Sequence, residues 1–329
     1  MPYTREKELI IYRSETIKRV LRCLVMAKIL VTGGAGFIGS HLVDSLIAEG
    51  HHVTAIDDLS IGKKEFVNPK AELVVSSITN DLDKLFTENS FDYVFHLAAQ
   101  TNLRVSLEKP LEDASVNILG SLNIINQCVK HKVKKIIFSS SGGALCSPHA
   151  PLPCTEESLI EPQSPYGIAK FTTEQYLRSA QSTHGLNYVA LRYSNVYGPR
   201  QNAKGEAGVV AIFINRLLEG KPLTIYSSGE QTRDFIYVAD VVSANLLAIS
   251  LEGIYNVGTQ QETSVKQIAE KLQKSLDKKG EINYAPKIAG EVERSCISAQ
   301  KLMQTGWKPL YSLEQGLQET IAWFKDLKQ

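Results

Sequence analysis

The sequence predicts an α/β fold in which a parallel β-sheet carries helices on both faces. Short runs rich in Val, Ile and Phe alternate along the chain with segments of helical periodicity. Continuous apolar runs are typical of parallel strands, which are buried on both faces. Repeated strand–helix alternation places the crossover helices on the two sides of one sheet. We therefore expect a doubly wound sheet.

The expected elements follow in chain order. Apolar runs predict strands over residues 28–32, 52–56, 71–75, 93–97, 135–140 and 186–193. Between the first two, an apolar stripe of Ile38, Leu42, Leu46 and Ile47 predicts a helix with one buried face. Longer helices are expected over residues 111–131 and 165–184.

The pattern loosens after about residue 195, where Gly and Pro punctuate shorter elements, as expected of a smaller α/β domain that binds the substrate. Residues 234–250 predict one more helix, and residues 253–258 a strand that returns to the first sheet. The two domains then interleave: residues 26–195 plus 236–258 form the first, and residues 196–235 plus 259–329 the second.

Residues 1–25 mix acids and bases and precede a second plausible start at Met26. They lack the uninterrupted apolar stretch of a signal peptide, and their acids argue against a transit peptide. We expect an extension outside the fold of a cytoplasmic protein.

Composition excludes several classes of function. The formal net charge of +1 argues against a nucleic-acid partner or a membrane surface, and no apolar run approaches a membrane span. Five cysteines without a CxxC pair predict free thiols in a reducing compartment, with neither a disulfide framework nor a metal site. They are Cys23, Cys128, Cys146, Cys154 and Cys296.

A glycine-rich turn, TGGAGFIGSHL, follows the first predicted strand and opens the first helix. Gly33, Gly36 and Gly39 are spaced three apart, and Gly34-x-Gly36-x-x-Gly39 also matches the dinucleotide fingerprint. Glycine lets the backbone approach a pyrophosphate, which the amide groups of the helix N-terminus then bind. In this strand–turn–helix context the motif predicts a Rossmann-type dinucleotide site.

Asp57 ends the second strand, 24 residues after Gly33. A carboxylate there accepts hydrogen bonds from the adenosine ribose and repels a 2′-phosphate, which favours NAD over NADP. Asp58 is the neighbouring alternative, while Lys63 and Lys64 leave open a less favoured 2′-phosphate site.

SPYGIAK holds a tyrosine and a lysine four positions apart, as does the N-terminal MPYTREK with Tyr3 and Lys7. With Ser164 as N-cap, Tyr166 and Lys170 lie one turn apart on one helix face. A nearby ammonium and a positive nicotinamide ring favour the phenolate, so a lowered pKa is expected for the tyrosine.

Together these motifs resemble the extended short-chain dehydrogenases/reductases. The similarity is greatest to their NAD-dependent epimerase/dehydratase group, and within it to the UDP-glucose 4-epimerases. It runs from about Met26 to the C-terminus. Further matching stretches are HLAAQ (96–100), Asn117-x-x-Gly120, RYSNVYGPRQ (192–201), QTRDFIYVAD (231–240) and GEVERS (290–295).

The resemblance assigns catalysis to Ser141, Tyr166 and Lys170, and an NAD site to a wider set. That set comprises Gly33, Gly36, Phe37, Ile38, Gly39, Asp57, Leu97, Ala98, Ala99, Asn117, Tyr166 and Lys170. Related dehydratases carry an acidic pair directly after the catalytic hydroxyl residue, where this chain has Gly142 and Gly143. Simple reversible oxidation at C4 is therefore expected.

For a UDP-sugar, the resemblance implies that Arg233 and Asn195 contact the diphosphate and Glu291 the uridine ribose, with Ser141 and Ser295 facing the hexose. The family's usual arginine three residues before that acid is Ile288 here. A small residue at Ser295 leaves room for an N-acetyl group.

The implied reaction is C4 epimerisation of UDP-glucose and UDP-galactose, with the N-acetyl sugars as further substrates, through a 4-keto intermediate. Two alternatives stay open: an epimerase of another nucleotide sugar such as UDP-glucuronate, and a non-catalytic NAD-binding scaffold. The resemblance also implies a homodimer joined through the helices near residues 111–131 and 165–184.

Overall fold

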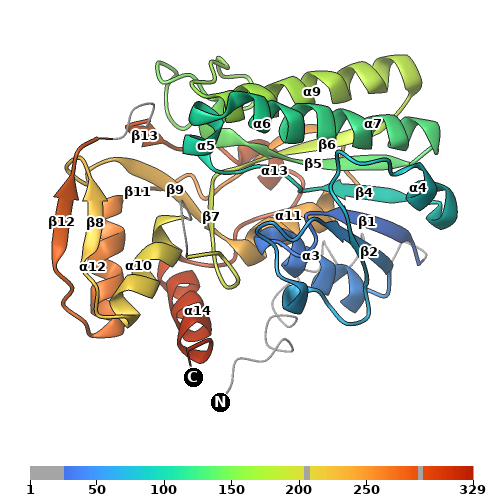
Figure 1. Cartoon of the computed structure of the whole chain (residues 1–329). Helices are drawn as coiled ribbons and strands as arrows, with labels where there is room; N and C mark the ends of the chain where they lie inside the picture. The colour runs from blue at the N-terminus through green and yellow to red at the C-terminus, as the bar shows by residue number, and fades with distance from the viewer. Residues whose placement is uncertain (1–25, 204–207, 288–291, 329) are drawn as a thin grey trace.

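The computed structural model describes residues 26–203, 208–287 and 292–328, so the predicted extension at 1–25 lies outside the described residues. The predicted α/β class is confirmed by a seven-stranded, all-parallel sheet with the order β10-β6-β5-β4-β1-β2-β3 (Figure 1). Its strands are β1 (Lys28–Thr32), β2 (His52–Asp57), β3 (Glu72–Val75), β4 (Tyr93–His96), β5 (Lys135–Ser141), β6 (Asn187–Tyr193) and β10 (Gly253–Val257).

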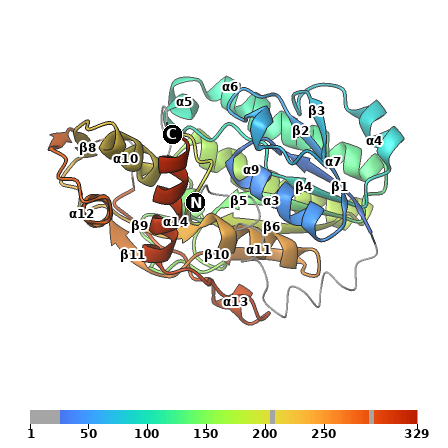
Figure 2. The ribbon, with the colours of Figure 1, turned by 90° about the horizontal axis from the view of Figure 1, so that it is seen from below.

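Helices cover both faces of this sheet. On one face α3 (Phe37–Ala48) and α11 (Val238–Ala248) lie side by side, as the view from below shows (Figure 2). The other face carries α4 (Asp83–Asn89), α5 (Leu103–Glu108), α6 (Pro110–Ala114), α7 (Ser121–Lys130) and α9 (Pro165–His184) (Figure 1). Two shorter segments are η1 (Lys64–Phe66) and α8 (Gly142–Leu145).

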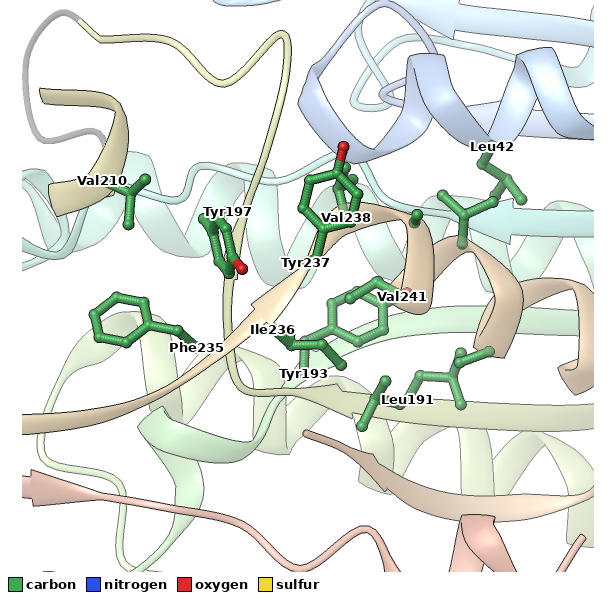
Figure 3. Packing of buried hydrophobic residues seen from close by; sticks show 14 of the residues in the cluster. Leu42, Leu191, Tyr193, Tyr197, Val210, Phe235, Ile236, Tyr237, Val238 and Val241 are labelled. Atoms are coloured by element: carbon green, nitrogen blue, oxygen red, sulfur yellow. The ribbon is translucent and has the colours of Figure 1, made fainter. Parts of the chain in front are cut away.

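Strand alternation divides the core into two clusters. Along β1, Ile29 and Val31 join the cluster against α3 and α11, whereas Leu30 joins the cluster against α4, α7 and α9. The first cluster continues into the smaller part of the molecule, where Tyr197 and Phe235 pack beyond Val241 (Figure 3). The continuous apolar core fixes the two parts relative to each other.

The smaller part is built around β9 (Thr232–Tyr237), which pairs with β11 (Glu262–Ser264), β13 (Arg294–Ser295) and β7 (Asn195–Tyr197). A second, two-stranded sheet joins β8 (Leu223–Tyr226) and β12 (Ile282–Ala285). The remaining helices are α10 (Val209–Leu218), α12 (Val265–Leu276), α13 (Gln300–Met303) and α14 (Leu313–Asp326). The division of the chain into two interleaved domains at the expected boundaries stays a prediction.

Two predicted helices differ from those observed. Residues 234–237 belong to β9, because they pair with neighbouring strands, and helix α11 begins only at Val238. The expected helix over 111–131 is interrupted by a π-helical segment, η2 (Ser115–Gly120), between α6 and α7. The wider π turn carries Asn117, a buried residue of the site described below.

The prediction of free cysteines was wrong for one pair. Cys146 and Cys154 form a disulfide bond, with Cα atoms 6.5 Å apart. The segment after α8 folds back on itself, so that Cys146 faces Ile160 in an isolated β-bridge and Cys154 meets residue 297. Cys128 and Cys296 are buried free thiols, and Cys23 lies outside the described residues. Among the described helices, none combines the length and apolar character needed to cross a membrane.

Candidate active site

The carboxyl end of β1 opens into a tightly packed glycine turn. Gly33 has φ +69°, and a side chain there would lie 2.8 Å from the Ala98 backbone nitrogen. A side chain at Gly39 would overlap the Gly33 carbonyl, so neither Gly33 nor Gly39 can carry a side chain here. Phe37 and Ile38 begin α3, whose N-cap residue Gly36 provides no side-chain cap. This cradle fits a dinucleotide pyrophosphate.

Asp57 ends β2 beside that turn. Its Oδ2 accepts a hydrogen bond from the Ala35 amide at 3.0 Å, and its Oδ1 from the Leu59 amide at 2.9 Å. Burial raises the pKa of the Asp57 carboxyl, and these backbone donors oppose the rise. Asp58 instead accepts from the backbone and hydroxyl of Ser60. Of the two acids, Asp57 lies against the turn.

The loop after β4 packs on the glycine turn. The Thr32 hydroxyl accepts hydrogen bonds from the amides of Leu97 and Ala98, at 3.1 Å each. It is also bonded to Nδ1 of His96, whose Nε2 meets the Ser121 hydroxyl. Burial, and then the Lys170 charge, lower the pKa of His96 to about 3, so this imidazole is neutral. Polar groups thus fix the loop containing residues 97–99 against the predicted cofactor turn.

Asn117 closes the same loop from η2. Its Oδ1 accepts from the Gln100 amide, and its Nδ2 donates to the Gln100 carbonyl, at 2.9 Å each. Its backbone carbonyl accepts from Thr173 of α9 at 3.2 Å. Asn117 therefore links the loop to the helix that carries the predicted catalytic pair.

Helix α9 presents Tyr166 and Lys170 toward the end of β5. Ser164 caps the helix by accepting from the Gly167 amide at 3.1 Å, as expected from the sequence. Lys170 Nζ donates to the Ser139 carbonyl at 2.8 Å and lies 5.7 Å from the Tyr166 ring centroid. Ser141 lies close enough to Tyr166 for its hydroxyl to lower the pKa of the phenol. The three predicted catalytic residues are therefore brought together.

The pKa of Tyr166 moves in the direction opposite to the expected one. Burial raises it to about 12, the charge of Asp113 adds to the rise, and the Ser141 hydrogen bond opposes it. Burial also lowers the pKa of Lys170 to about 8, although the charges of Asp113 and Glu174 act to raise it. Desolvation is the largest effect on both groups: at Tyr166 the Asp113 charge adds to it, and at Lys170 the charges of Asp113 and Glu174 oppose it. The protein's own groups thus keep the phenol protonated at neutral pH.

Three of the residues predicted to bind the UDP-sugar lie on the four-stranded sheet around β9. Arg233 of β9 is the register partner of Ser295 on β13, and Asn195 of β7 is the partner of Phe235, two positions further along β9. Arg233 donates to the Thr232 carbonyl at 2.8 Å. Glu291 and Ile288 lie outside the described residues.

A pocket of about 550 Å³ adjoins Ser295. Gly143 and Ser295 both line it and lie close together, since a side chain at Gly143 would come within 2.8 Å of the Ser295 hydroxyl. The pocket wall includes Ser147, Gln163, Arg294 and the disulfide-bonded residues Cys146 and Cys154. Gly143 therefore lets Ser295, the residue predicted to face the hexose, pack against the end of the catalytic strand at the edge of the pocket.

Several polar residues of this site were not singled out from the sequence. Thr32 and His96 end buried strands, and Gln100 follows one of them. Their position after or at the ends of apolar runs was the available signal, because the carboxyl ends of parallel strands gather at one edge. Asp113 had no such signal, since it lies within a helix.

Comparisons with known proteins agree with this arrangement. The model of the NAD-dependent epimerase/dehydratase family matches residues 29–258. A UDP-glucose 4-epimerase of Thermotoga maritima, solved with UDP-glucose, is 44% identical and has a TM-score of 0.91; the match covers 92% of this chain and 100% of that one.

Two further structures are also similar. The UDP-glucose 4-epimerase of Thermus thermophilus, solved with NAD, is 40% identical with a TM-score of 0.88, covering 91% of this chain and 99% of that one. A UDP-N-acetylglucosamine 4-epimerase of Methanobrevibacter ruminantium, in complex with UDP-N-acetylmuramic acid, is 36% identical with a TM-score of 0.87. That match covers 92% of this chain and 100% of the other.

Proposed function

The chain belongs to the NAD-dependent epimerase/dehydratase family, and from this premise we propose that it is a UDP-hexose 4-epimerase. It inverts carbon 4 of UDP-glucose or UDP-galactose through a 4-keto intermediate. The observation that carries the proposal is the contact of Ser141, Tyr166 and Lys170 beside a bare glycine turn. Gly142 and Gly143 offer no acid for chemistry beyond C4.

NAD is the cofactor of this family, and the residues around the turn fit it. Gly33, Gly36 and Gly39 let the pyrophosphate approach the N-terminus of α3, and Asp57 accepts from the adenosine ribose. When bound, NAD supplies the hydride acceptor that oxidises carbon 4, the donor that reduces it again, and a positively charged nicotinamide ring. In this proposal the NAD site is lined by Leu97, Ala98 and Ala99, and Asn117 lies behind them.

The protein's part in the reaction is proton control. The Tyr166 oxygen takes the proton of the sugar C4 hydroxyl and returns it after inversion, and the Ser141 hydroxyl bridges the two oxygens. Because burial keeps Tyr166 protonated, the phenolate needs an added positive charge close to the ring. Lys170 Nζ has one donor on the Ser139 carbonyl, and its other donors serve the nicotinamide ribose.

The substrate diphosphate is assigned to the four-stranded sheet around β9. Arg233 offers a planar fork to its oxygens, and Asn195 lies two residue positions from it across the β7–β9 pairing. Glu291 contacts the uridine ribose in this proposal. We assign the hexose to the space between Ser141 and Ser295.

The pocket beside Ser295 supports acceptance of an N-acetyl substituent. Ser295 and Gly143 are both small, and the pocket behind them extends along the Cys146–Cys154 segment. The similarity to an epimerase of UDP-N-acetylglucosamine agrees with this assignment. UDP-N-acetylglucosamine is therefore proposed as a second substrate.

A homodimer is proposed through α6, η2 and α9. Leu111 is 86% exposed, and Leu119 and Ile168 are 61% and 51% exposed on the same outer layer of helices. Exposed aliphatic side chains gathered on one layer are typical of an interface with a second copy. The expected result is a dimer by sedimentation equilibrium that dissociates in Leu111→Glu with Ile168→Glu.

An NMR time course tests the reaction. Purified protein is incubated separately with UDP-glucose and UDP-N-acetylglucosamine, with and without added NAD. Conversion to the C4 epimer is expected for wild type and lost in Tyr166→Phe, whereas Tyr284→Phe, an exposed tyrosine of β12, keeps it. Turnover of UDP-glucuronate alone would replace the proposed substrate, and turnover of no nucleotide sugar would favour the scaffold alternative.

A further inference from the structure

Asp113 places a buried carboxylate next to the candidate catalytic pair. It lies in the last turn of α6 and is 1% exposed. Its Oδ1 accepts hydrogen bonds from Gln100 Nε2 at 2.8 Å and from Asn117 Nδ2 at 2.9 Å. Its Oδ2 is buried, and no hydrogen-bond partner for it lies within the described residues. A carboxylate oxygen without a partner is costly to bury, which indicates a role beyond packing.

The hydrogen-bond partners of Asp113 connect it to the loop beside the glycine turn and to the helix of the catalytic pair. Gln100 belongs to the loop that packs on the glycine turn, and it exchanges two hydrogen bonds with Asn117. The Asn117 carbonyl accepts from Thr173, which follows Lys170 by three residues on α9. The carboxylate is therefore anchored to the loop after β4 and, through Asn117, to the helix of the catalytic pair.

The other charged groups near the pair are balanced or neutral. On α9, Glu174 is held by two hydrogen bonds from Arg192 of β6, at 2.9 and 2.7 Å. His96 of β4 is neutral at physiological pH. Asp113 forms no ion pair within the described part of the chain, yet its charge acts on both Tyr166 and Lys170. It is thus the less compensated of the two buried acids that face Lys170.

We propose that Asp113 is a positioning residue of the epimerase site, whose negative charge balances the Lys170 ammonium while its Oδ1 orients Gln100 and Asn117. The inference rests on the proposed function for its role in turnover. Its electrostatic part concerns Lys170 itself and does not depend on which sugar is bound.

The substitution Asp113→Asn removes the negative charge of the side chain and keeps its shape. The new amide oxygen can accept from Gln100 and Asn117 as Oδ1 does, and the amide nitrogen takes the position of the unpartnered Oδ2, so no hydrogen bond need be broken. The carboxylate raises the pKa of both Tyr166 and Lys170. Its removal must therefore lower both.

The first test is NMR titration of protein labelled with ¹³C at the lysine Cε, with Lys170 assigned by its loss in Lys170→Arg. Wild-type Lys170 is expected to titrate near pH 8. Asp113→Asn should lower that midpoint by about half a unit or more. Glu112→Gln is the matched control, because this neighbouring carboxylate is exposed and paired with Lys109. An unchanged Lys170 midpoint in Asp113→Asn would overturn the proposal.

The second test is the pH profile of kcat/KM for UDP-glucose epimerisation. Both limbs should move to lower pH in Asp113→Asn, because the base and the ammonium both titrate earlier. A lower rate with unmoved limbs would mean a merely structural role and would overturn the inference. Asp113→Ser, which keeps an acceptor, replaces the asparagine variant if that protein does not fold. A wild type without turnover would refute the proposed function, while the Lys170 titration would still decide the electrostatic inference.

Discussion

The buried ion pair between Glu174 and Arg192 gives the sharpest stability prediction. Their side chains are 0% and 5% exposed. The Glu174 carboxylate accepts from Arg192 Nε at 2.9 Å, from Arg192 Nη2 at 2.7 Å and from the Ser140 hydroxyl at 2.6 Å. Glu174 lies one turn beyond Lys170, and Ser140 precedes Ser141. The pair therefore fixes α9 against β5 and β6 where the catalytic residues meet.

Glu174→Gln should lower the free energy of unfolding by about 3–5 kcal/mol. The amide keeps one acceptor but turns a donor toward the guanidinium, so at least one charge-assisted hydrogen bond is lost, worth about 1.5–3 kcal/mol. The remainder is the cost of leaving the Arg192 charge buried without its counterion. Glu174→Leu combined with Arg192→Met removes both charges and should cost less than the single change.

Urea unfolding followed by circular dichroism measures the effect, with an unchanged slope required for each variant. Glu88→Gln is the control, because Glu88 pairs with Lys84 on exposed α4 and should cost only about 0.3–0.5 kcal/mol. A Glu174→Gln protein within about 1 kcal/mol of wild type would refute the assignment of this pair as a buried, mutually dependent unit.

Three further changes test other features. Asp57→Ser should weaken NAD binding and raise the affinity for NADP relative to NAD, measured by calorimetry; an equal loss for both would contradict the assignment. Removing the disulfide in Cys146→Ser should lower the unfolding free energy by about 2–3 kcal/mol, and a dithiol reductant should then have no further effect on this variant. Burial raises the pKa of Asp240 from 3.8 to about 7, so its contribution to stability is lost as pH rises through 7. Asp240→Asn should therefore gain stability relative to wild type between pH ~4 and ~8, and a pH-independent difference would disprove the shift.

Much of the larger sheet could be predicted because its central strands, β1, β2, β4, β5 and β6, are buried on both faces. Apolar runs located all seven strands, and β1 and α9 have the expected bounds. A buried parallel strand needs apolar residues at every position, and this requirement leaves a signal that one sequence can show. The glycine turn was equally visible, since close packing against Ala98 excludes any side chain.

The remaining features depend on contacts between distant segments. The π turn around Asn117 lets its side chain reach Gln100, which lies on another loop. Cys146 and Cys154 are ordinary in spacing, and only the folded-back segment brings them together. The sequence of residues 234–237 suits a helix or a strand, and their pairing with β7 and β11 decides for the strand.

The acid–base properties of the site also divide into a part that the sequence shows and a part that depends on burial in the folded structure. A tyrosine and a lysine one turn apart predict that the ammonium lowers the phenol pKa, but burial reverses that expectation and leaves Tyr166 near 12. The charge of Asp113 favours the protonated phenol of Tyr166 and the ammonium form of Lys170. The protein's own charges therefore do not make Tyr166 a base. Bound NAD would supply the opposing positive charge in its oxidised form, and Tyr166 would hold its proton more tightly once that charge is gone. In the proposed reaction, Tyr166 would therefore release its proton more readily while the cofactor is oxidised, and the charge of Asp113 favours the protonated phenol throughout.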